Sequence, residues 1–227
     1  MKAVPVIAID GPSGSGKGTV SRRVAEALGF HLLDSGALYR LVGLAGSRAG
    51  LDPADEPGHA AIAAAMEVRF GTGPGGGEAV WLAGEEVTDA IRTELAGSLA
   101  SRVASIPAVR AALVGRQRRF AAPPGLVADG RDMGSVIFPQ ALLKVFLTAS
   151  AEERAARRHK QLKDKGLNVS LAGLSREIAE RDQRDSTRAV SPLVAAADAV
   201  TLDSTRLTPD AVVARVLALA RERLAGA

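Results

Sequence analysis

A chain of 227 residues is long enough for one α/β domain with an insertion or for two small domains, and 47% hydrophobic residues support a core. It contains no cysteine, which excludes disulfide bonds and thiolate metal sites, and no apolar run approaches the length of a membrane span. The net charge is +4 and the pI about 9.8, but only six of the 29 basic residues are lysine and only 3% of all residues are aromatic. Arginine-rich charge with few stacking rings favours small phosphate esters over polymeric nucleic acid as ligands.

Five short apolar runs, separated by helical patterns, are typical of the buried strands of a parallel sheet. They are Val4–Ile9, Phe30–Leu33, Leu126–Ala128, Leu142–Leu147 and Ala199–Leu202. Helices are expected at Lys17–Leu28, Ala37–Ala49, Pro107–Phe120, Ala151–Lys165 and Pro209–Leu224, the last with Thr208 as its N-cap. This alternation predicts an α/β fold with a doubly wound, five-stranded parallel sheet.

Two stretches interrupt the alternation. Between Met66 and Thr93, the runs MEVRF and EAVWL flank GTGPGGG and predict a small antiparallel hairpin or a three-stranded insert. We interpret Gly71–Gly77 as a mobile hairpin tip and not as a second phosphate loop, because no helix follows it. The second interruption, Arg154–Arg188, is polar, densely charged and helical in pattern.

The segment DGPSGSGKGT, residues 10–19, lies between the first predicted strand and the first predicted helix. A glycine-rich turn in this position leaves backbone N–H groups free to bind phosphate oxygens, aided by the helix dipole. The residue after Lys17 is Gly18 instead of Ser or Thr, and the hydroxyl comes at Thr19. G-K-G-T resembles the loop of nucleoside monophosphate kinases, in which Lys17 would reach the donor β- and γ-phosphates and Thr19 would lie near Mg²⁺. The guanine-reading pattern N-K-x-D is missing, which disfavours a GTPase.

Two further motifs follow predicted strands, where a doubly wound sheet binds its ligands. DSGALYR, residues 34–40, places Ser35 and Arg40 beside the phosphate loop, although Arg40 on its own also suits a solvated helix face. DGRDMG, residues 129–134, offers Asp129 as a carboxylate that binds Mg²⁺ through water. Arg131 and Asp132 would project into the same space, and a self-satisfied ion-pair cluster is the alternative interpretation.

Helical spacing groups the charges of the polar segment. Arg154 and Arg158 lie four residues apart on one helix face, and Arg181, Asp185 and Arg188 follow i, i+4, i+7 spacing. Taken alone, each set also fits a solvated, salt-bridged face.

Together these motifs make the chain resemble the bacterial cytidylate kinases. The resemblance rests on DGPSGSGKGT, LLDSGALYR, EEVTDAIRT, RQRRF, DGRDMGSVIFP, ASAEERAARR, ERDQRDSTRAVSPL and AADAVTLDST, in order along nearly the whole chain. The DGRDMG and RDxRDxxRAVxPL patterns are far more specific than the phosphate loop. Departures are minor: the hairpin loop is unusually rich in glycine, and Ser186-Thr187 occupy tolerant positions.

The resemblance implies a P-loop nucleoside monophosphate kinase fold in three parts. A core would comprise about 1–60, 105–153 and 190–227, a nucleoside-monophosphate-binding insert about 61–104, and a short helical lid about 154–189. The implied reaction is ATP + (d)CMP giving ADP + (d)CDP in pyrimidine nucleotide metabolism, with Mg²⁺.

The resemblance also implies roles for individual residues. The ATP-binding loop would be Gly11, Pro12, Ser13, Gly14, Ser15, Gly16, Lys17, Gly18 and Thr19, with Thr19 and Asp129 serving the metal. The acceptor phosphate would be bound by Ser35, Arg40 and Arg131. Cytosine would be bound by Ser101, Arg110 and Asp132, and the pentose by Arg181 and Asp185. The residues acting on the transferred phosphate would be Lys17, Arg131, Arg154, Arg158 and Arg188.

Residue chemistry supports the choice of base independently. Cytosine presents an N4 amino donor, which a carboxylate at Asp132 can accept, whereas uracil presents O4, an acceptor. A kinase of broader range for UMP and CMP is the nearest alternative. An RNA-associated P-loop protein lacks a basic stripe, and a non-catalytic nucleotide sensor fits poorly with Lys17, Asp129 and the arginines. We expect a cytoplasmic monomer that binds ATP and CMP or dCMP, without nucleic acid or membrane partners; whether Arg157 or Arg184 contacts phosphate stays open.

Overall fold

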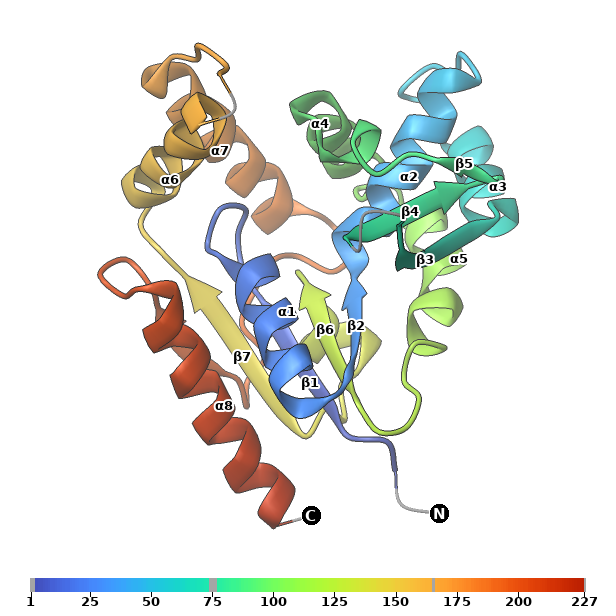
Figure 1. Cartoon of the computed structure of the whole chain (residues 1–227). Coiled ribbons are helices and arrows are strands. Elements are labelled where there is room, and N and C mark those ends of the chain that lie inside the picture. Colours follow the sequence, from blue (N-terminus) through green and yellow to red (C-terminus); the bar gives the residue numbers. More distant parts are fainter. Residues whose placement is uncertain (1–2, 74–76, 165, 227) are drawn as a thin grey trace. The chain divides into compact units, whose positions relative to one another are not determined.

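The protein is described here by a computed structural model, which covers residues 3–73, 77–164 and 166–226 (Figure 1). The chain divides into two compact units, one formed by Met1–Asp34 with Gln117–Ala227 and the other by Ser35–Arg116. Residues 74–76 of the predicted hairpin tip and Lys165 of a predicted helix lie outside the described residues.

The first unit contains a five-stranded parallel sheet in the order β2-β6-β1-β7-β8. Its strands are β1 (Val6–Asp10), β2 (His31–Asp34), β6 (Leu126–Gly130), β7 (Leu143–Thr148) and β8 (Val200–Asp203). The predicted five-stranded parallel sheet is confirmed, and most strand ends are shifted by one or two residues. Strands β1 and β6 are buried along their whole length, which explains why they read as continuous apolar runs.

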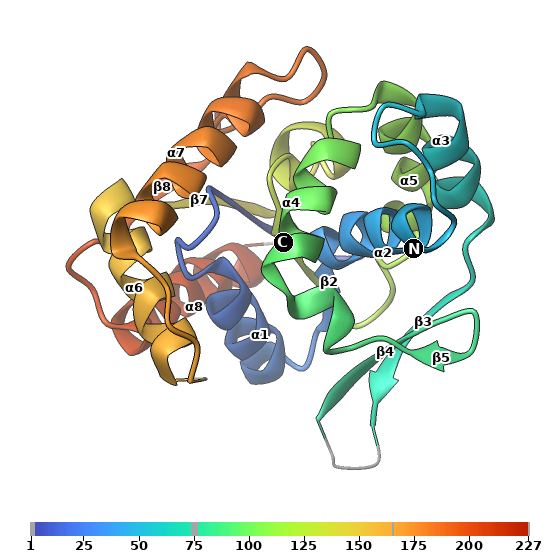
Figure 2. The same ribbon diagram turned by 90° about the horizontal axis from the view of Figure 1, so that it is seen from above.

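Helices α1 (Lys17–Leu28) and α8 (Pro209–Ala225) pack against each other beside this sheet (Figure 1). Their apolar faces, including Val20, Val24 and Val216, form one core cluster with β1 and β7. Thr208 caps α8, as predicted, since its side chain accepts a hydrogen bond from the N–H of Ala211. The polar segment forms two helices, α6 (Ala151–Asp164) and α7 (Leu171–Thr187), which pack against each other (Figure 2).

Strand register brings several polar residues to the carboxyl edge of the first unit's sheet. Asp34 pairs with Asp129, Asp10 with Gly130, and Thr148 with Asp203. Because all five strands are parallel, these ends share one edge, which is where open α/β sheets bind ligands.

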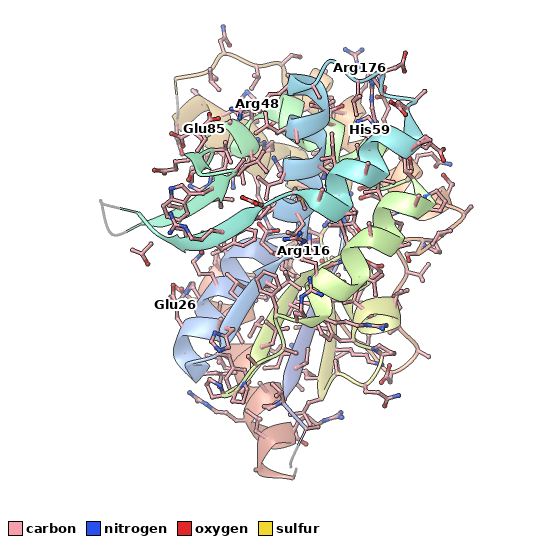
Figure 3. All side chains as sticks on the ribbon, turned by 90° about the vertical axis from the view of Figure 1, so that its right-hand side faces the viewer. Glu26, Arg48, His59, Glu85, Arg116 and Arg176 are labelled. Carbon is pink, nitrogen blue, oxygen red and sulfur yellow. The ribbon has the colours of Figure 1, made fainter. Side chains whose placement is uncertain are left out.

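The second unit combines four helices with a small sheet. They are α2 (Ser35–Arg48), α3 (Glu56–Ala65), α4 (Glu94–Val103) and α5 (Pro107–Arg118), and the antiparallel sheet is β3 (Val68–Thr72), β4 (Glu78–Leu82) and β5 (Glu85–Glu86). The three-stranded alternative for the insert is thus confirmed, whereas α3 and α4 were missing from the predicted elements. Arg48 donates to both carboxylate oxygens of Glu85 at 2.8 Å, so that α2 is tied to the small sheet (Figure 3).

No helix within the described residues combines the length and the apolar character needed to span a membrane.

Candidate active site

The phosphate loop connects β1 to α1 in a conformation that requires glycine. Gly11 has φ of 151°, and a side chain there would collide with the carbonyl oxygen of Leu147. Gly14 has φ of 77°, and a Cβ there would lie 3.1 Å from Cβ of Arg154 on α6. The loop is therefore shaped by backbone geometry and by the close approach of β7 and α6.

Lys17, the first residue of α1, is only 6% exposed, and its Nζ donates to the carbonyl of Pro12 at 3.0 Å. Burial, followed by the nearby positive charge of Arg131, lowers the pKa of Lys17 to about 7. The ammonium group thus lies folded over the loop, with too little negative charge around it to offset its desolvation. An anionic ligand on the loop would supply that charge.

Asp129 lies at the end of β6, directly against the start of α1. Its Oδ2 is 3.5 Å from the point that a Cβ on Gly18 would occupy. Burial raises the pKa of Asp129 to about 7, against the opposing influence of Lys17 and Arg131. Gly18 therefore leaves room beside a carboxylate, and the hydroxyl of Thr19 stands exposed on the next residue of α1.

The side-chain oxygens of Thr19 and Asp129 suit a Mg²⁺ ion that is shared with a phosphate ligand. No cluster of three or more His, Asp or Glu side chains that could hold a metal occurs among the described residues. Mg²⁺ commonly keeps several waters and takes one or two protein carboxylates plus substrate phosphates. One hydroxyl and one carboxylate beside the phosphate loop fit that requirement, and a divalent cation would favour the ionised form of Asp129.

The segment after β6 gathers three of the predicted acceptor-site residues. Arg131 donates through Nε to Oδ2 of Asp185 on α7 at 3.0 Å and through Nη1 to the carbonyl of Gly130 at 3.2 Å. Asp132, 2% exposed, precedes a π-helical turn at Met133–Ile137. Desolvation works against the charge of Asp185, but Arg131, Arg188 and Arg181 together lower its pKa below the ordinary value.

Helix α6 meets the phosphate loop through arginines. Arg154, 4% exposed, donates to the carbonyls of Ala149 and Ser13 and to both carboxylate oxygens of Asp182 on α7. Arg157 donates to the side-chain oxygen of Ser204 at 3.1 Å and to the Ser204 carbonyl at 2.6 Å. It also donates to the carbonyl of Ser15 at 3.5 Å. Arg158 lies on the same helix and donates to Gln161 at 3.2 Å.

The first unit therefore brings together most of the predicted site. Charges that act on Lys17 come from Arg131, Asp129, Arg181 and Asp10, and those that act on Asp185 include Arg188. Arg154 approaches the same loop from α6. Arg158 donates to Gln161 of its own helix, and the charge of Glu177 on α7 acts on it.

The remaining predicted acceptor residues lie in the second unit. Ser35 begins α2 and is 3% exposed, and Arg40 of the same helix donates to the carbonyls of Ile91 at 2.6 Å and Thr93 at 3.2 Å. Ser101 on α4 and Arg110 on α5 are each 4% exposed, and the Arg110 guanidinium lies 5.6 Å from the ring centroid of Tyr39. The hydroxyl oxygen of Ser101 has no hydrogen-bond partner among the described residues.

Sequence reasoning missed several residues that organise the site. They are buried or partly buried acceptors. Asp10 fixes the DGRDMG segment, Asp182 fixes Arg154, and Ser204 fixes Arg157. Asp10 and Asp182 lie within recognisable motifs, but only the contact itself reveals their partners. For Arg157, the structure provides Glu153, Ser204 and the loop carbonyl of Ser15 as partners.

Comparison with known proteins gives one consistent family. The family model described as Cytidylate kinase matches residues 7–222. The chain is 57% identical to the protein named Cytidylate kinase from Pseudomonas aeruginosa (strain LESB58), over 95% of this chain and 94% of that protein. The one from Pseudomonas syringae pv. tomato (strain DC3000) is 59% identical over 94% and 93%. The one from Stutzerimonas stutzeri (strain A1501) is 55% identical over the full length of both chains.

Proposed function

Because the chain belongs to the cytidylate kinase family, we propose that it transfers the γ-phosphoryl group of ATP to CMP or dCMP, giving ADP and CDP or dCDP. The observation that carries the proposal is the meeting of Lys17, Asp129 and Arg131 at the carboxyl edge of the parallel sheet. That edge combines a phosphate loop with a separate set of acidic and basic groups that can bind a second nucleotide.

The reaction makes modest demands on the protein. An oxygen of the CMP phosphate forms a bond to Pγ, the bond from Pγ to the β-phosphate oxygen breaks, and ADP leaves. Alignment of the two nucleotides and positive charge on the moving group supply most of the acceleration. Lys17 and the loop N–H groups would bind the donor phosphates, and their negative charge would return the Lys17 pKa toward its ordinary value.

Thr19 and Asp129, the latter through water, would hold Mg²⁺ together with ATP. The ion supplies charge neutralisation on the β- and γ-phosphate oxygens when bound. Asp129 must be ionised for this role, and its proximity to Lys17 helps to keep it so.

Acceptor recognition is proposed for residues in both units. In the first unit, Arg131 would bind the CMP phosphate, Asp132 the N4 amino group, and Arg181, Asp185 and Arg188 the pentose and phosphate. In the second unit, Ser35 and Arg40 would bind phosphate, and Ser101 and Arg110 cytosine. Support comes from burial: Ser101, Arg110, Asp132 and Asp185 are polar side chains at most 4% exposed. Polar groups that are this deeply buried are strongly selective when a ligand completes their hydrogen bonds.

We propose the segment about 154–189 as a lid, in which Arg154 and Arg158 serve the phosphates and closure excludes water from the reaction. The insert is proposed at about 61–104, although the compact second unit extends over Ser35–Arg116. The core is proposed to be the rest of the chain. Arg154 supports a role of this segment at the phosphates, because it joins α6 to α7 and to the phosphate loop.

The proposal extends to the setting of the enzyme. We propose a cytoplasmic monomer that acts in pyrimidine nucleotide metabolism on free nucleotides, without nucleic acid or membrane partners. The scarcity of aromatic residues and the scatter of the arginines along the chain support this assignment.

Transfer of label tests the reaction directly. Purified protein is incubated with ATP labelled at the γ-phosphate, Mg²⁺ and CMP, and the products are separated. We expect the label in CDP, with one ADP formed per CDP and little label in free phosphate. Label that appears only in free phosphate, or no transfer to CMP, would contradict the proposed function. A broader kinase for UMP and CMP would label UDP as efficiently as CDP.

A further inference from the structure

Asp10 makes a pair of contacts that the mechanism above leaves unused. It is the last residue of β1, immediately before the phosphate loop, and is 6% exposed. Oδ1 accepts the backbone N–H of Met133 and Oδ2 accepts that of Gly134, both at 2.8 Å. A buried carboxylate whose two oxygens each bind a successive backbone N–H fixes that stretch of chain strongly.

The stretch that Asp10 fixes directly follows Arg131 and Asp132. Beyond it, the carbonyl of Asp132 accepts the N–H groups of Val136 at 2.9 Å and Ile137 at 3.1 Å, which closes the π-helical turn. Asp132 therefore stands between two fixed points: the end of β6 on one side and the anchored turn on the other. The backbone from which the Asp132 side chain projects is therefore restrained on both sides.

A second contact, with Lys144, supports this π-helical turn. A Cβ at Gly134 would lie 3.1 Å from Cγ and Cδ of Lys144, which is tighter than ordinary van der Waals contact. Lys144, on β7, is 8% exposed, and its Nζ binds Asp198 at 2.8 Å. The turn is thus held between the carboxylate of Asp10 and the side chain of Lys144.

We propose that Asp10 is a positioning residue for acceptor choice: it fixes the backbone of Met133 and Gly134 and thereby holds the Asp132 carboxylate in register with N4 of cytosine. This inference rests on the proposed function, because it assigns Asp132 to the base. The inference adds Asp10, to which we assign no contact with either nucleotide. Asp10 lies on the strand that leads into the phosphate loop.

Only a carboxylate suits both contacts. Asparagine offers one acceptor oxygen and one NH₂ donor, so its NH₂ would face a backbone N–H and one anchor would be lost. Burial raises the pKa of Asp10 to about 6 despite the two N–H donors, which act in the opposite direction. Assays at about pH 8 therefore compare an ionised Asp10 with asparagine.

The test measures kcat and KM of Asp10→Asn for CMP, UMP and ATP. Loss of one hydrogen bond to a buried charge should raise KM for CMP about tenfold and narrow the CMP-to-UMP ratio of kcat/KM. KM for ATP should change less than about twofold, since the donor loop keeps its own contacts. Asp52→Asn is the control, because Asp52 also accepts a backbone N–H, that of Ala54 at 2.7 Å, and lies at an exposed position to which no site role is assigned. It should leave all three KM values unchanged.

Amide hydrogen exchange of the ligand-free protein supplies a readout that does not depend on the reaction. Met133 and Gly134 should be protected in the wild type and exchange faster in Asp10→Asn. Rapid exchange at both positions in the wild type would overturn the anchor itself. Faster exchange in the variant with an unchanged CMP-to-UMP ratio would overturn the positioning role. Failure of the wild type to phosphorylate CMP would instead contradict the proposed function and leave the exchange result standing.

A second variant covers the case in which Asp10→Asn does not fold. Gly134→Ala keeps Asp10 but places a Cβ 3.1 Å from the Lys144 side chain, so that the turn or that side chain must shift by a few tenths of an ångström. It should also narrow the CMP-to-UMP ratio while sparing KM for ATP. Equal loss for both acceptors would contradict the claim that the position of this turn sets acceptor choice.

Discussion

Lys17 is a buried cation, and its surroundings in the ligand-free protein stabilise the positive charge poorly. A bound anion would stabilise that charge better. Burial and the neighbouring Arg131 lower the pKa of Lys17 to about 7, so the ligand-free fold is destabilised by keeping this ammonium group charged. Its Nζ donates to the backbone carbonyl of Pro12. A residue with these properties is expected to contribute to turnover at the expense of stability.

Lys17→Met should therefore separate activity from stability. Loss of one preorganised charge should reduce turnover by at least about 100-fold. The melting temperature in the absence of ligand should stay equal to the wild-type value or rise, because a desolvated charge is removed. Lys160→Met, the same change at an exposed lysine of α6, is the control. Turnover near the wild-type rate with an unchanged melting curve would refute the role of Lys17.

Asp10 should give stability a distinct pH dependence. Its pKa is 3.8 when unfolded and about 6 when folded, so the folded state binds the proton more tightly between these values. The resulting stabilisation is complete below the unfolded pKa and is lost as pH rises through the folded pKa. The free energy of unfolding of the wild type minus that of Asp10→Asn should thus fall by about 2 kcal/mol between about pH 4 and pH 7. Urea unfolding of both proteins measures it, and a difference that is constant or rises with pH would contradict the assignment.

Asp132 is the residue to which we assign the choice between cytosine and uracil. An ionised carboxylate can only accept, so it matches N4 of cytosine and opposes O4 of uracil. Asp132→Ala should lower kcat/KM for CMP much more than for UMP. Arg110→Met should lower both, because each base presents O2. If Asp132→Ala reduced the use of CMP and UMP by the same factor, base choice would have to lie elsewhere.

At the scale of elements, an ion pair between Arg154 and Asp182 joins helices α6 and α7. Arg154 is 5% exposed at its side chain and Asp182 is 30% exposed, and Arg154 also reaches the loop carbonyl of Ser13. Removing one partner of such a pair leaves a largely desolvated charge. The pair therefore couples the packing of the proposed lid helices to the phosphate loop.

Asp182→Ala should destabilise this pair of helices. We expect a loss of about 2 kcal/mol, less than for a fully buried pair because Asp182 is partly exposed. Limited proteolysis without ligand should cut the variant faster within Leu171–Thr187 than the wild type. Glu180→Ala, at an exposed position of the same helix, should behave as the wild type. Equal cleavage rates in all three proteins would show that the ion pair does not hold α7.

At the scale of the whole molecule, much of the fold follows from local sequence signals. Buried parallel strands appear as apolar runs, and the phosphate loop and the N-cap Thr208 have local signatures, so β1, α1 and α8 were predictable. Helices α3 and α4 were missed: each has only ten residues, several of them Ala or Gly, so that their apolar periodicity is weak and the caps Asp55 and Thr93 alone were not enough to predict them.

The site was less predictable than the fold. Motifs place Lys17 at the start of a helix and Asp129 and Asp132 at the end of a strand, but many of the contacts around these residues come from distant parts of the chain. The Asp10 contacts to Met133 and Gly134 span more than 120 residues, and the Arg154 contact to Asp182 joins two helices. Single-sequence patterns describe periodicity and local turns, whereas such contacts depend on tertiary packing.

Acceptor specificity of the unmodified protein tests the central claim most directly. The measurement is kcat/KM for CMP, dCMP, UMP and AMP at saturating Mg²⁺ and ATP, followed as ADP formation. We predict efficient use of CMP or dCMP and a kcat/KM for UMP and AMP that is lower by at least about tenfold, the discrimination expected when a buried polar group is left unpaired. Equal or greater efficiency with UMP or AMP would contradict the account of this chain as a cytidylate kinase.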